Sequence, residues 1–542
     1  MQGGRLCNGE ARATGRSVRL SLSVLLLVPL LSGCLPGLKW GDDDADNGPA
    51  PVSSEGEPAL NRSYKSDFLA SGAQNLQGQL IPGIASDVWS AFSTIERRSA
   101  GTGAGGLFGT GTETGAAFEP ALLPPAASLA NFYSALAKLA SKQRSQPVAI
   151  LHLGDDHIAH DHFAGALREH LTGRFGAAGR GVMMPGLYPI RGMKTDRRGR
   201  WSLASAAAGA EGPFGITGVR MTSASPDAWL RFSSGQGTFD WAEVTFMTGP
   251  GFGTALVSVD NDTKSVPTGA LTANETAIRI STRAHEVVIR PGGDGPISVL
   301  SVATGTDTPG IAYSNLGLPG AAASTLGKWT ADFAANDLRR LNPDLILLQY
   351  GTREGFDDSL DVGQYETQAR ENIERIKQWA PQASVLVAGP PDAARLPAFS
   401  GSAGAQICRA LSAHEVANYR AMIERSDERL AHWHAPPRLE AVGAALRRAA
   451  AATGSFYWDW TKYMGGPCAI HSWATLTPPL AAPDHKTLTE AGDSRSARAL
   501  FAELMAGYDA YQRAARAKAP AFLTTTEVKP VPPAKKRHAK TP

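Results

Sequence analysis

The chain has 542 residues and a formal net charge of +3, with 43% hydrophobic and 19% charged residues. This composition is typical of a globular protein of several domains that can bury a large core. The near balance of charge argues against a nucleic-acid-binding protein, and four cysteines are too few for a disulfide scaffold. A single segment of the sequence is apolar enough to consider for a membrane, which excludes a polytopic membrane protein.

That apolar segment lies near the N-terminus. Residues 20–31 are too short a run to span a bilayer, and several arginines precede them, as in a signal peptide. The run ends in Leu31-Ser32-Gly33-Cys34, which resembles a bacterial lipobox, with cleavage before Cys34 and acylation of its thiol. An ordinary signal peptide with a chance cysteine is the alternative. The resemblance implies residues 1–33 as a lipoprotein signal peptide and a lipid anchor, and Leu35 favours the outer membrane, facing the periplasm or the cell surface.

The region after the signal peptide is predicted to be a tether followed by the start of an α/β domain. Residues 34–117 are polar at first and end in a Gly/Thr/Ala-rich stretch, a composition typical of flexible linkers. Residues 118–199 then show apolar periodicity of a helix at 128–141, a buried strand at 148–153 and a helix at 163–176.

The pattern changes between residues 200 and 307. Short segments such as WAEVTFM and TALVSVD alternate apolar with polar residues, and Gly, Asn and Asp separate them. This alternation predicts an inserted antiparallel β-sandwich, similar to carbohydrate-binding domains.

The βα rhythm returns over residues 308–515, which we interpret as the second part of the α/β domain. Continuous apolar runs at 345–348 and 385–388 predict central parallel strands. Helices are expected between and after them, at 331–340, 364–379, 411–449 and 492–515. The last segment, 516–542, carries seven Lys and Arg against one Glu and is predicted to be a basic disordered tail, with docking to anionic envelope polymers as an alternative role.

Two cysteines, Cys408 and Cys468, remain after Cys34 is acylated and Cys7 is removed with the signal peptide. The expected compartment is oxidising, so a disulfide between them is one possibility. A pair of unpaired buried thiols is the other, and the sequence alone does not separate the two.

Four blocks in the sequence carry a family resemblance. They are ILHLGDDHIAHDHFAGALREHLTGRFGAAGRG from residue 150, NLGLPGA from 315, QYGTRE from 349, and YWDW from 457 with DHKTLT from 484. Their order and spacing resemble the SGNH, or GDSL-type, hydrolases, and more narrowly envelope members with an inserted β-domain, which include peptidoglycan O-acetyl esterases. The resemblance covers residues 148–510. It implies an α/β fold with three αβα layers, flavodoxin-like, into which the antiparallel β-sandwich is inserted.

The residues that the family uses for catalysis are mostly replaced in this chain. The resemblance places Asp156 where the family has its nucleophilic serine, and Thr487 where it has the histidine base. Arg353 stands at the position of the oxyanion-hole asparagine. The glycine of that hole is retained as Gly320, and the aspartate that orients the histidine is retained as Asp484.

These replacements predict a protein without the serine-esterase mechanism. Acyl transfer needs a hydroxyl nucleophile beside a base of pKa near 7. Asp156 cannot act as that nucleophile, and Thr487 cannot act as that base. His485 is close in sequence, but its offset of one position from Asp484 is expected to point its ring elsewhere. We also expect an ion pair between Asp156 and Arg353 to fill the site, since a partly buried carboxylate needs a partner. The leading hypothesis is a pseudoenzyme that binds glycan or assists an active paralogue.

Two other readings stay open. One is an active carbohydrate or peptidoglycan O-acetyl esterase with a non-standard catalytic set. The other is a metal-dependent hydrolase that uses the cluster of Asp155, His157, His160 and His162. Against a metal, Asp155 and His157 match family positions that form hydrogen bonds on this turn, and His160 and His162 do not share a helix face.

The expected partners follow from the leading hypothesis. They are a membrane reached through the lipid anchor, peptidoglycan or an acetylated polysaccharide, and an active SGNH paralogue. No cofactor, no metal and no nucleic acid is expected.

Overall fold

The computed structural model describes residues 122–518, apart from residues 187, 189 and 236. The signal peptide, the whole tether with Cys34, and most of the basic tail lie outside these residues. Among the described residues, no helix is both long and apolar enough to cross a membrane.

A five-stranded parallel sheet in the order β13-β1-β14-β15-β16 forms the centre of the α/β part. Its strands are β1 (Val148–Gly154), β13 (Ile311–Gly317), β14 (Leu345–Gln349), β15 (Ser384–Ala388) and β16 (Phe456–Trp458). Gly154, the last residue of β1, pairs with Gly317 on one side and with Gln349 on the other. The carboxyl ends of these three strands therefore meet, and the carboxyl ends of the strands are where open α/β sheets bind ligands.

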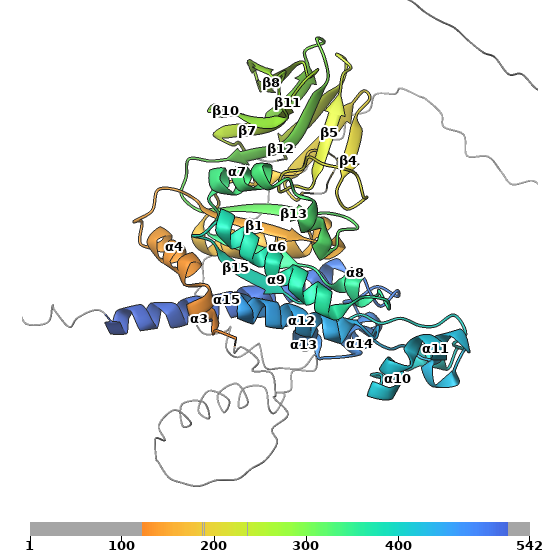
Figure 1. The fold of residues 1–542 in the computed structure, drawn as a ribbon. Coiled ribbons are helices and arrows are strands. Elements are labelled where there is room, and N and C mark those ends of the chain that lie inside the picture. Colours follow the sequence, from red (N-terminus) through yellow and green to blue (C-terminus); the bar gives the residue numbers. More distant parts are fainter. Residues whose placement is uncertain (1–121, 187, 189, 236, 519–542) are drawn as a thin grey trace, which may run out of the picture. The chain divides into compact units, whose positions relative to one another are not determined.

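Helices cover both faces of this sheet (Figure 1). Because successive side chains of a strand point to opposite faces, each strand contributes to two cores, with Ile150 in one and Leu151 in the other. The longer helices of the first core are α4 (Ala130–Ala140), α6 (Phe163–Phe175) and α15 (Glu490–Lys518). The helices of the second core are α7 (Ala331–Leu341), α9 (Val362–Trp379) and α12 (Leu439–Ala452).

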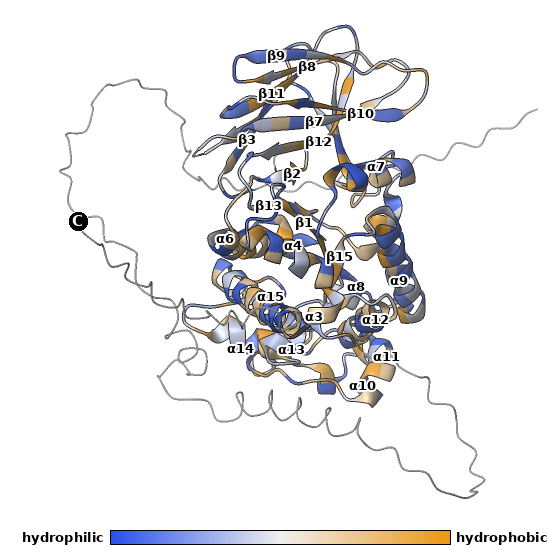
Figure 2. Ribbon diagram, turned by 90° about the vertical axis from the view of Figure 1, so that its left-hand side faces the viewer, coloured by the Kyte–Doolittle hydropathy of each residue, from blue (hydrophilic) through white to orange (hydrophobic). Residues whose placement is uncertain are grey.

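Local sequence explains where these helices begin and end. Gly176 at φ +84° follows α6, because glycine reaches positive φ without a steric cost. The Asp361 side chain accepts the Gln364 N–H and caps the start of α9. Hydrophilic and hydrophobic residues are mixed along α9, as expected of a helix with one face on a core (Figure 2).

The insertion is an antiparallel β-sandwich. One sheet has the order β10-β7-β12-β5-β4 with β2 paired to β12, and the other has the order β3-β6-β11-β8-β9. The strands are β2 (Gly181–Met183), β3 (Met193–Arg198), β4 (Ser202–Ser205), β5 (Val219–Ser223), β6 (Trp229–Ser234), β7 (Trp241–Thr248), β8 (Thr254–Val259), β9 (Asp262–Pro267), β10 (Asn274–Ile280), β11 (Glu286–Pro291) and β12 (Ile297–Gly305). Phe232 and Phe246 are buried in the core between the two sheets.

The expected fold class, an α/β sheet with an inserted β-sandwich, is confirmed. The sandwich includes two strands that precede residue 200, the boundary expected from the sequence. β2 pairs with β12, and β3 pairs with β6. β3 has the sequence MKTDRR and lies at the edge of its sheet, and charged residues are common on edge strands. The alternation of apolar and polar residues that predicts the other strands is therefore absent from β3.

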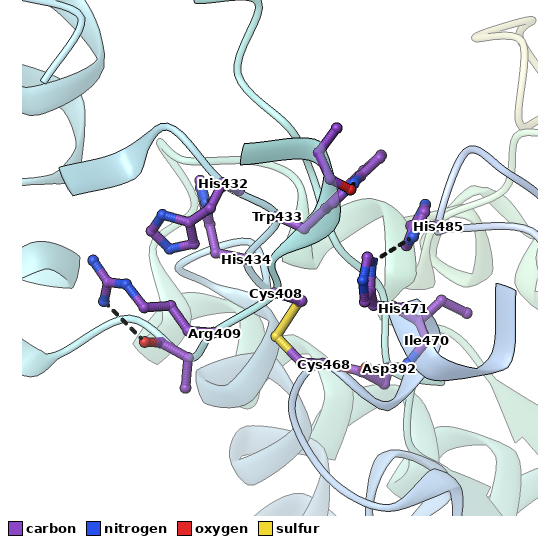
Figure 3. The surroundings of a disulfide bond; sticks show 12 residues. Asp392, Cys408, Arg409, His432, Trp433, His434, Cys468, Ile470, His471 and His485 are labelled. Atoms are coloured by element: carbon purple, nitrogen blue, oxygen red, sulfur yellow. Dashed lines mark hydrogen bonds between the residues drawn. A yellow bond between two sulfur atoms is a disulfide. The ribbon is translucent and has the colours of Figure 1, made fainter. Parts of the chain in front are cut away.

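A lobe, residues 396–437, replaces part of the long helical segment expected at 411–449. It contains the short helices α10 (Ala413–Ala417) and α11 (Tyr419–Glu424) and a small core around Met422. Pro436 and Pro437 separate the lobe from α12, since proline does not continue a helix. A disulfide joins Cys408 of the lobe to Cys468, which lies between α13 (Trp460–Met464) and α14 (Ala469–Thr475) (Figure 3).

Candidate functional site

The site begins on the turn that follows β1. Asp155 is buried and caps the short helix α5 (Asp156–Ala159), because its Oδ1 accepts the His157 N–H at 3.1 Å. Asp156, the next residue, is exposed. The position that the family resemblance assigns to a nucleophile is therefore an exposed carboxylate at the carboxyl end of β1.

The Asp156 carboxylate binds the backbone of the second block. Its two oxygens accept the Gly320 N–H at 3.1 and 3.2 Å. The resemblance assigns this N–H to the oxyanion hole, where it would stabilise negative charge that develops during acyl transfer. In this chain a carboxylate of the protein itself already uses that donor.

Arg353 does not form the ion pair that we expected with Asp156, and that prediction was wrong. Its Nη1 donates instead to the Gly320 carbonyl oxygen at 2.5 Å, and no Arg353 nitrogen lies within salt-bridge distance of Asp156. Arg353 extends from α8 (Thr352–Gly355) and is exposed, as is Asp156. Because water solvates both charges, direct pairing is not needed, and the two side chains hold opposite ends of the same glycine.

Thr487 and Asp484 form a closed set of hydrogen bonds. The Thr487 hydroxyl donates to Asp484 Oδ2 at 2.7 Å, and the N–H groups of Lys486 and Thr487 both donate to Oδ1 at 2.9 Å. These bonds lower the pKa of Asp484, against a burial effect that by itself raises it. In the family this carboxylate orients the histidine. In this chain it accepts hydrogen bonds from a threonine, which cannot act as a base.

His485 points away from this set, as expected from its offset. Its ring stacks on Trp433 of the lobe with centroids 3.8 Å apart, and its Nε2 lies 2.9 Å from His471 Nδ1 (Figure 3). Its Nδ1 faces the Pro483 carbonyl at 2.9 Å, so it carries the proton and Nε2 accepts from His471. His485 joins the lobe to the last loop and takes no part at Asp156.

The sequence did not indicate the buried hydrogen bonds next to the turn that follows β1. Asp161 is fully buried and accepts four hydrogen-bond donors: two from the Arg168 guanidinium at 3.1 and 2.8 Å, the Arg191 N–H at 2.7 Å and the Asn315 side-chain amide at 2.9 Å. Arg168 is 4% exposed, so this is a buried ion pair. Asp161 lies just before α6 and Arg168 lies on it, so no helical spacing in the sequence indicates this pair.

The metal candidates are dispersed. Asp155 is engaged as a cap, and the half-buried ring of His157 lies edge-on to Trp460 with centroids 5.7 Å apart. Burial lowers the pKa of His157 to about 4, so the ring is neutral at pH 7. The rings of His160 and His162 are 6.4 Å apart, and His162 faces Arg191 at 3.4 Å. Among the described residues, no group of three or more His, Cys, Asp or Glu side chains could hold a metal ion.

Buried carboxyl groups next to the site make the stability of the folded protein depend on pH. Burial, and then the neighbouring Glu354 and Asp156, raise the pKa of Asp155 to about 8. Glu354 also has a raised pKa, chiefly from burial. The folded state therefore holds a proton on Asp155 at pH values where the unfolded chain, with an aspartate pKa near 3.8, has lost it.

Asp155→Asn is expected to remove part of this pH dependence. The folded chain binds more protons than the unfolded chain between pH 3.8 and about 8, so the contribution of Asp155 to stability falls as pH rises through that window. The limit for one proton is roughly 1.4 kcal/mol per pH unit. Urea unfolding at pH 5 and pH 7 should show a smaller loss of stability for Asp155→Asn, which keeps the capping oxygen. The exposed Asp332→Asn serves as control, and equal slopes for all three proteins would contradict the assignment.

Comparison with known proteins gives the fold. No family model matches the chain, and no curated protein matches it. A solved peptidoglycan O-acetylesterase structure is 22% identical with a TM-score of 0.56, and the match covers 70% of this chain and 96% of the esterase. A family two carbohydrate esterase from Cellvibrio japonicus is 12% identical with a TM-score of 0.23, covering 58% and 99%. An acetyl xylan esterase is 12% identical with a TM-score of 0.24, covering 36% and 82%.

The first of these matches shows the class of fold to which the chain belongs. It is an α/β fold with a parallel sheet and an inserted antiparallel β-domain, similar to the fold of that peptidoglycan O-acetylesterase structure. A match at 22% identity shows the fold alone, and the chemistry has to be argued from the residues of this chain.

Proposed function

We propose that this protein is a non-catalytic SGNH-type protein of the bacterial envelope, anchored by a lipid at Cys34, that binds envelope glycan or assists an active paralogue. The observation that carries the proposal is the contact between Asp156 and Gly320. A carboxylate of the protein accepts the N–H that the family uses for the oxyanion, at 3.1 and 3.2 Å. An ester oxyanion at that point would meet both an occupied donor and a like charge.

The remaining positions support the same conclusion. An ester hydrolase of this type needs a nucleophilic hydroxyl, a base beside it and a group that orients the base. In this chain Thr487 takes the place of the base and donates to Asp484. Arg353, at the position of the asparagine, is bound to the carbonyl of Gly320. Asp156 and Thr487 each satisfy a polar group that catalysis would need free, and Arg353 donates to a backbone carbonyl instead.

The envelope location rests on the sequence of the first 34 residues, which lie outside the described part of the chain. The lipobox resemblance at Leu31-Ser32-Gly33-Cys34 supports a lipid anchor. The disulfide between Cys408 and Cys468 fits an oxidising compartment. Peptidoglycan or an acetylated polysaccharide is the glycan class that we propose, by analogy of fold.

The full-length chain, purified in detergent, is expected to show no hydrolysis of an acetyl-ester reporter above the uncatalysed rate. Asp156→Ala should leave this result unchanged, since no catalytic step depends on Asp156. Turnover that Asp156→Ala abolishes would overturn the proposal in favour of an esterase with a non-standard catalytic set. Turnover that a chelator abolishes would favour a metal-dependent hydrolase instead.

A further inference from the structure

A cavity of about 550 Å³ lies apart from the degenerate site. None of Asp156, Gly320, Arg353 and Thr487 lines it. Its volume falls within the range of pockets that bind small ligands. The lobe forms one wall, α12 forms another, and residues 457–467 contribute a third.

The lobe wall is apolar and is covalently fixed. Leu411 and Pro436 from the lobe line the cavity, as do Ala410 and Pro467. Ala410 is two residues from Cys408, and Pro467 directly precedes Cys468, so the disulfide ties together two walls of the cavity (Figure 3). Next to it, buried Asp392, also a lining residue, accepts the Ile470 N–H at 2.8 Å. The walls are therefore held in place before any ligand arrives, which lowers the entropy cost of binding.

Several polar groups in the cavity make no hydrogen bond or ion pair through their side chains with a described residue. The Tyr457 ring is buried, yet its hydroxyl makes no hydrogen bond to any described residue. Burial raises the pKa of Tyr457, so this hydroxyl keeps its proton and can donate. Arg447 and Lys462 are exposed and have no ion-pair partner among the residues that the structure describes.

Carboxylate side chains line the cavity together with these donors. Asp459 uses one oxygen to accept the Lys462 N–H at 2.9 Å, and its other oxygen accepts no hydrogen bond from a described residue. Glu440 on α12 is exposed at the cavity. The lining holds three basic side chains, Arg447, Arg448 and Lys462, and three carboxyl groups, Asp392, Glu440 and Asp459, so the cavity does not select a ligand of large net charge. Closely mixed donors and acceptors suit hydroxyl groups, each of which both donates and accepts.

We propose that this cavity binds a saccharide unit, with its hydroxyl groups on Tyr457, Arg447 and Asp459 and its CH face against the apolar wall of the lobe. The proposal rests on the proposed glycan-binding function and assigns that function to a site other than the one homologous to an esterase centre. The saccharide can come from peptidoglycan or from another envelope polysaccharide, since both present the same hydroxyl chemistry.

The test is calorimetric titration of the full-length protein with two saccharides, the N-acetylglucosamine–N-acetylmuramic acid disaccharide and xylobiose. Saturable binding of at least one is expected, and the tighter of the two identifies the source. Tyr457→Phe and Arg447→Gln should each weaken it about three- to tenfold, the effect of one lost hydrogen bond. Arg370→Gln, an exposed arginine on α9 paired with Glu374, is the matched control and should bind as the unchanged chain does.

The outcomes separate this inference from the proposed function. Saturable binding that Tyr457→Phe and Arg447→Gln leave unchanged, in variants with native circular dichroism, would overturn the assignment of the cavity while glycan binding itself stands. Absence of binding to both saccharides would overturn the assignment together with glycan binding, and the esterase assay would still decide separately whether the chain is catalytic.

Discussion

The triple variant Asp156→Ser, Arg353→Asn, Thr487→His is expected to hydrolyse an acetyl-ester reporter at least about 100-fold faster than the unchanged chain. A serine at position 156 would release the Gly320 N–H, which Asp156 now occupies at 3.1 Å. A histidine at position 487 would replace the hydroxyl that donates to Asp484 Oδ2 at 2.7 Å, so the carboxylate would orient a base instead.

The three substitutions should not unfold the protein, because Asp156, Arg353 and Thr487 are all exposed. The double variant Asp156→Ser, Arg353→Asn is the control, since it has a hydroxyl and an open N–H but lacks a base. Reporter hydrolysis followed by absorbance, with thermal unfolding as a check of folding, measures the effect. A folded triple variant with no more activity than the double variant would show that these three substitutions do not restore the serine-esterase chemistry of the family.

Arg168→Met is expected to destabilise the protein by about 3–5 kcal/mol, the usual cost of leaving one partner of a buried ion pair alone. Arg168 donates twice to Asp161, at 3.1 and 2.8 Å, and both side chains are buried. Methionine fills similar space but leaves the Asp161 carboxylate with only the Asn315 amide and the Arg191 N–H. The turn that carries Asp156 lies just before this pair in the chain, and the Asn315 amide binds both Asp161 and the Ile158 carbonyl of that turn. Urea unfolding at pH 7 measures the change.

Arg174→Met on the same helix is the matched control. Its pair with Asp509 spans 3.4 Å, and the two side chains are 39% and 53% exposed. Exposed pairs of this kind contribute roughly 0–1 kcal/mol, so this variant should unfold close to the unchanged chain. Similar losses for Arg168→Met and Arg174→Met would contradict the view that burial of the Asp161 pair is what makes it costly to break.

Much of the α/β fold could be predicted from the sequence, because the continuous apolar runs and the helical periodicity are local signals. β1, β14 and β15 lie where those runs predicted strands, and α7, α9 and α15 lie within a few residues of their expected bounds. The long helix expected at 411–449 was the main error in secondary structure. Short helices and Pro436-Pro437 divide that segment, and the lobe they form depends on packing around Met422 and on the disulfide.

The residues of the site could be predicted from the sequence, but their contacts with one another could not. The sequence placed Asp156, Gly320 and Arg353 in one site, and the structure brings these residues together. Charge alone suggested an Asp156–Arg353 pair. The structure shows instead that a backbone N–H and a backbone carbonyl of Gly320 bind the two side chains, and a backbone partner leaves no trace in residue type.

The sequence by itself determined which groups stand at two positions of the site: a carboxylate at 156, which has no nucleophilic hydroxyl, and a threonine at 487, which is not a base. The tertiary structure decided what those residues do instead, and it brought together the cavity beside the lobe from Tyr457, Arg447 and lobe residues up to 47 positions away. It also joined Cys408 to Cys468 across 60 residues, which the sequence had left open. The physical reason is that residue type fixes the reactivity of a group, whereas its neighbours are set by long-range packing that no local pattern encodes.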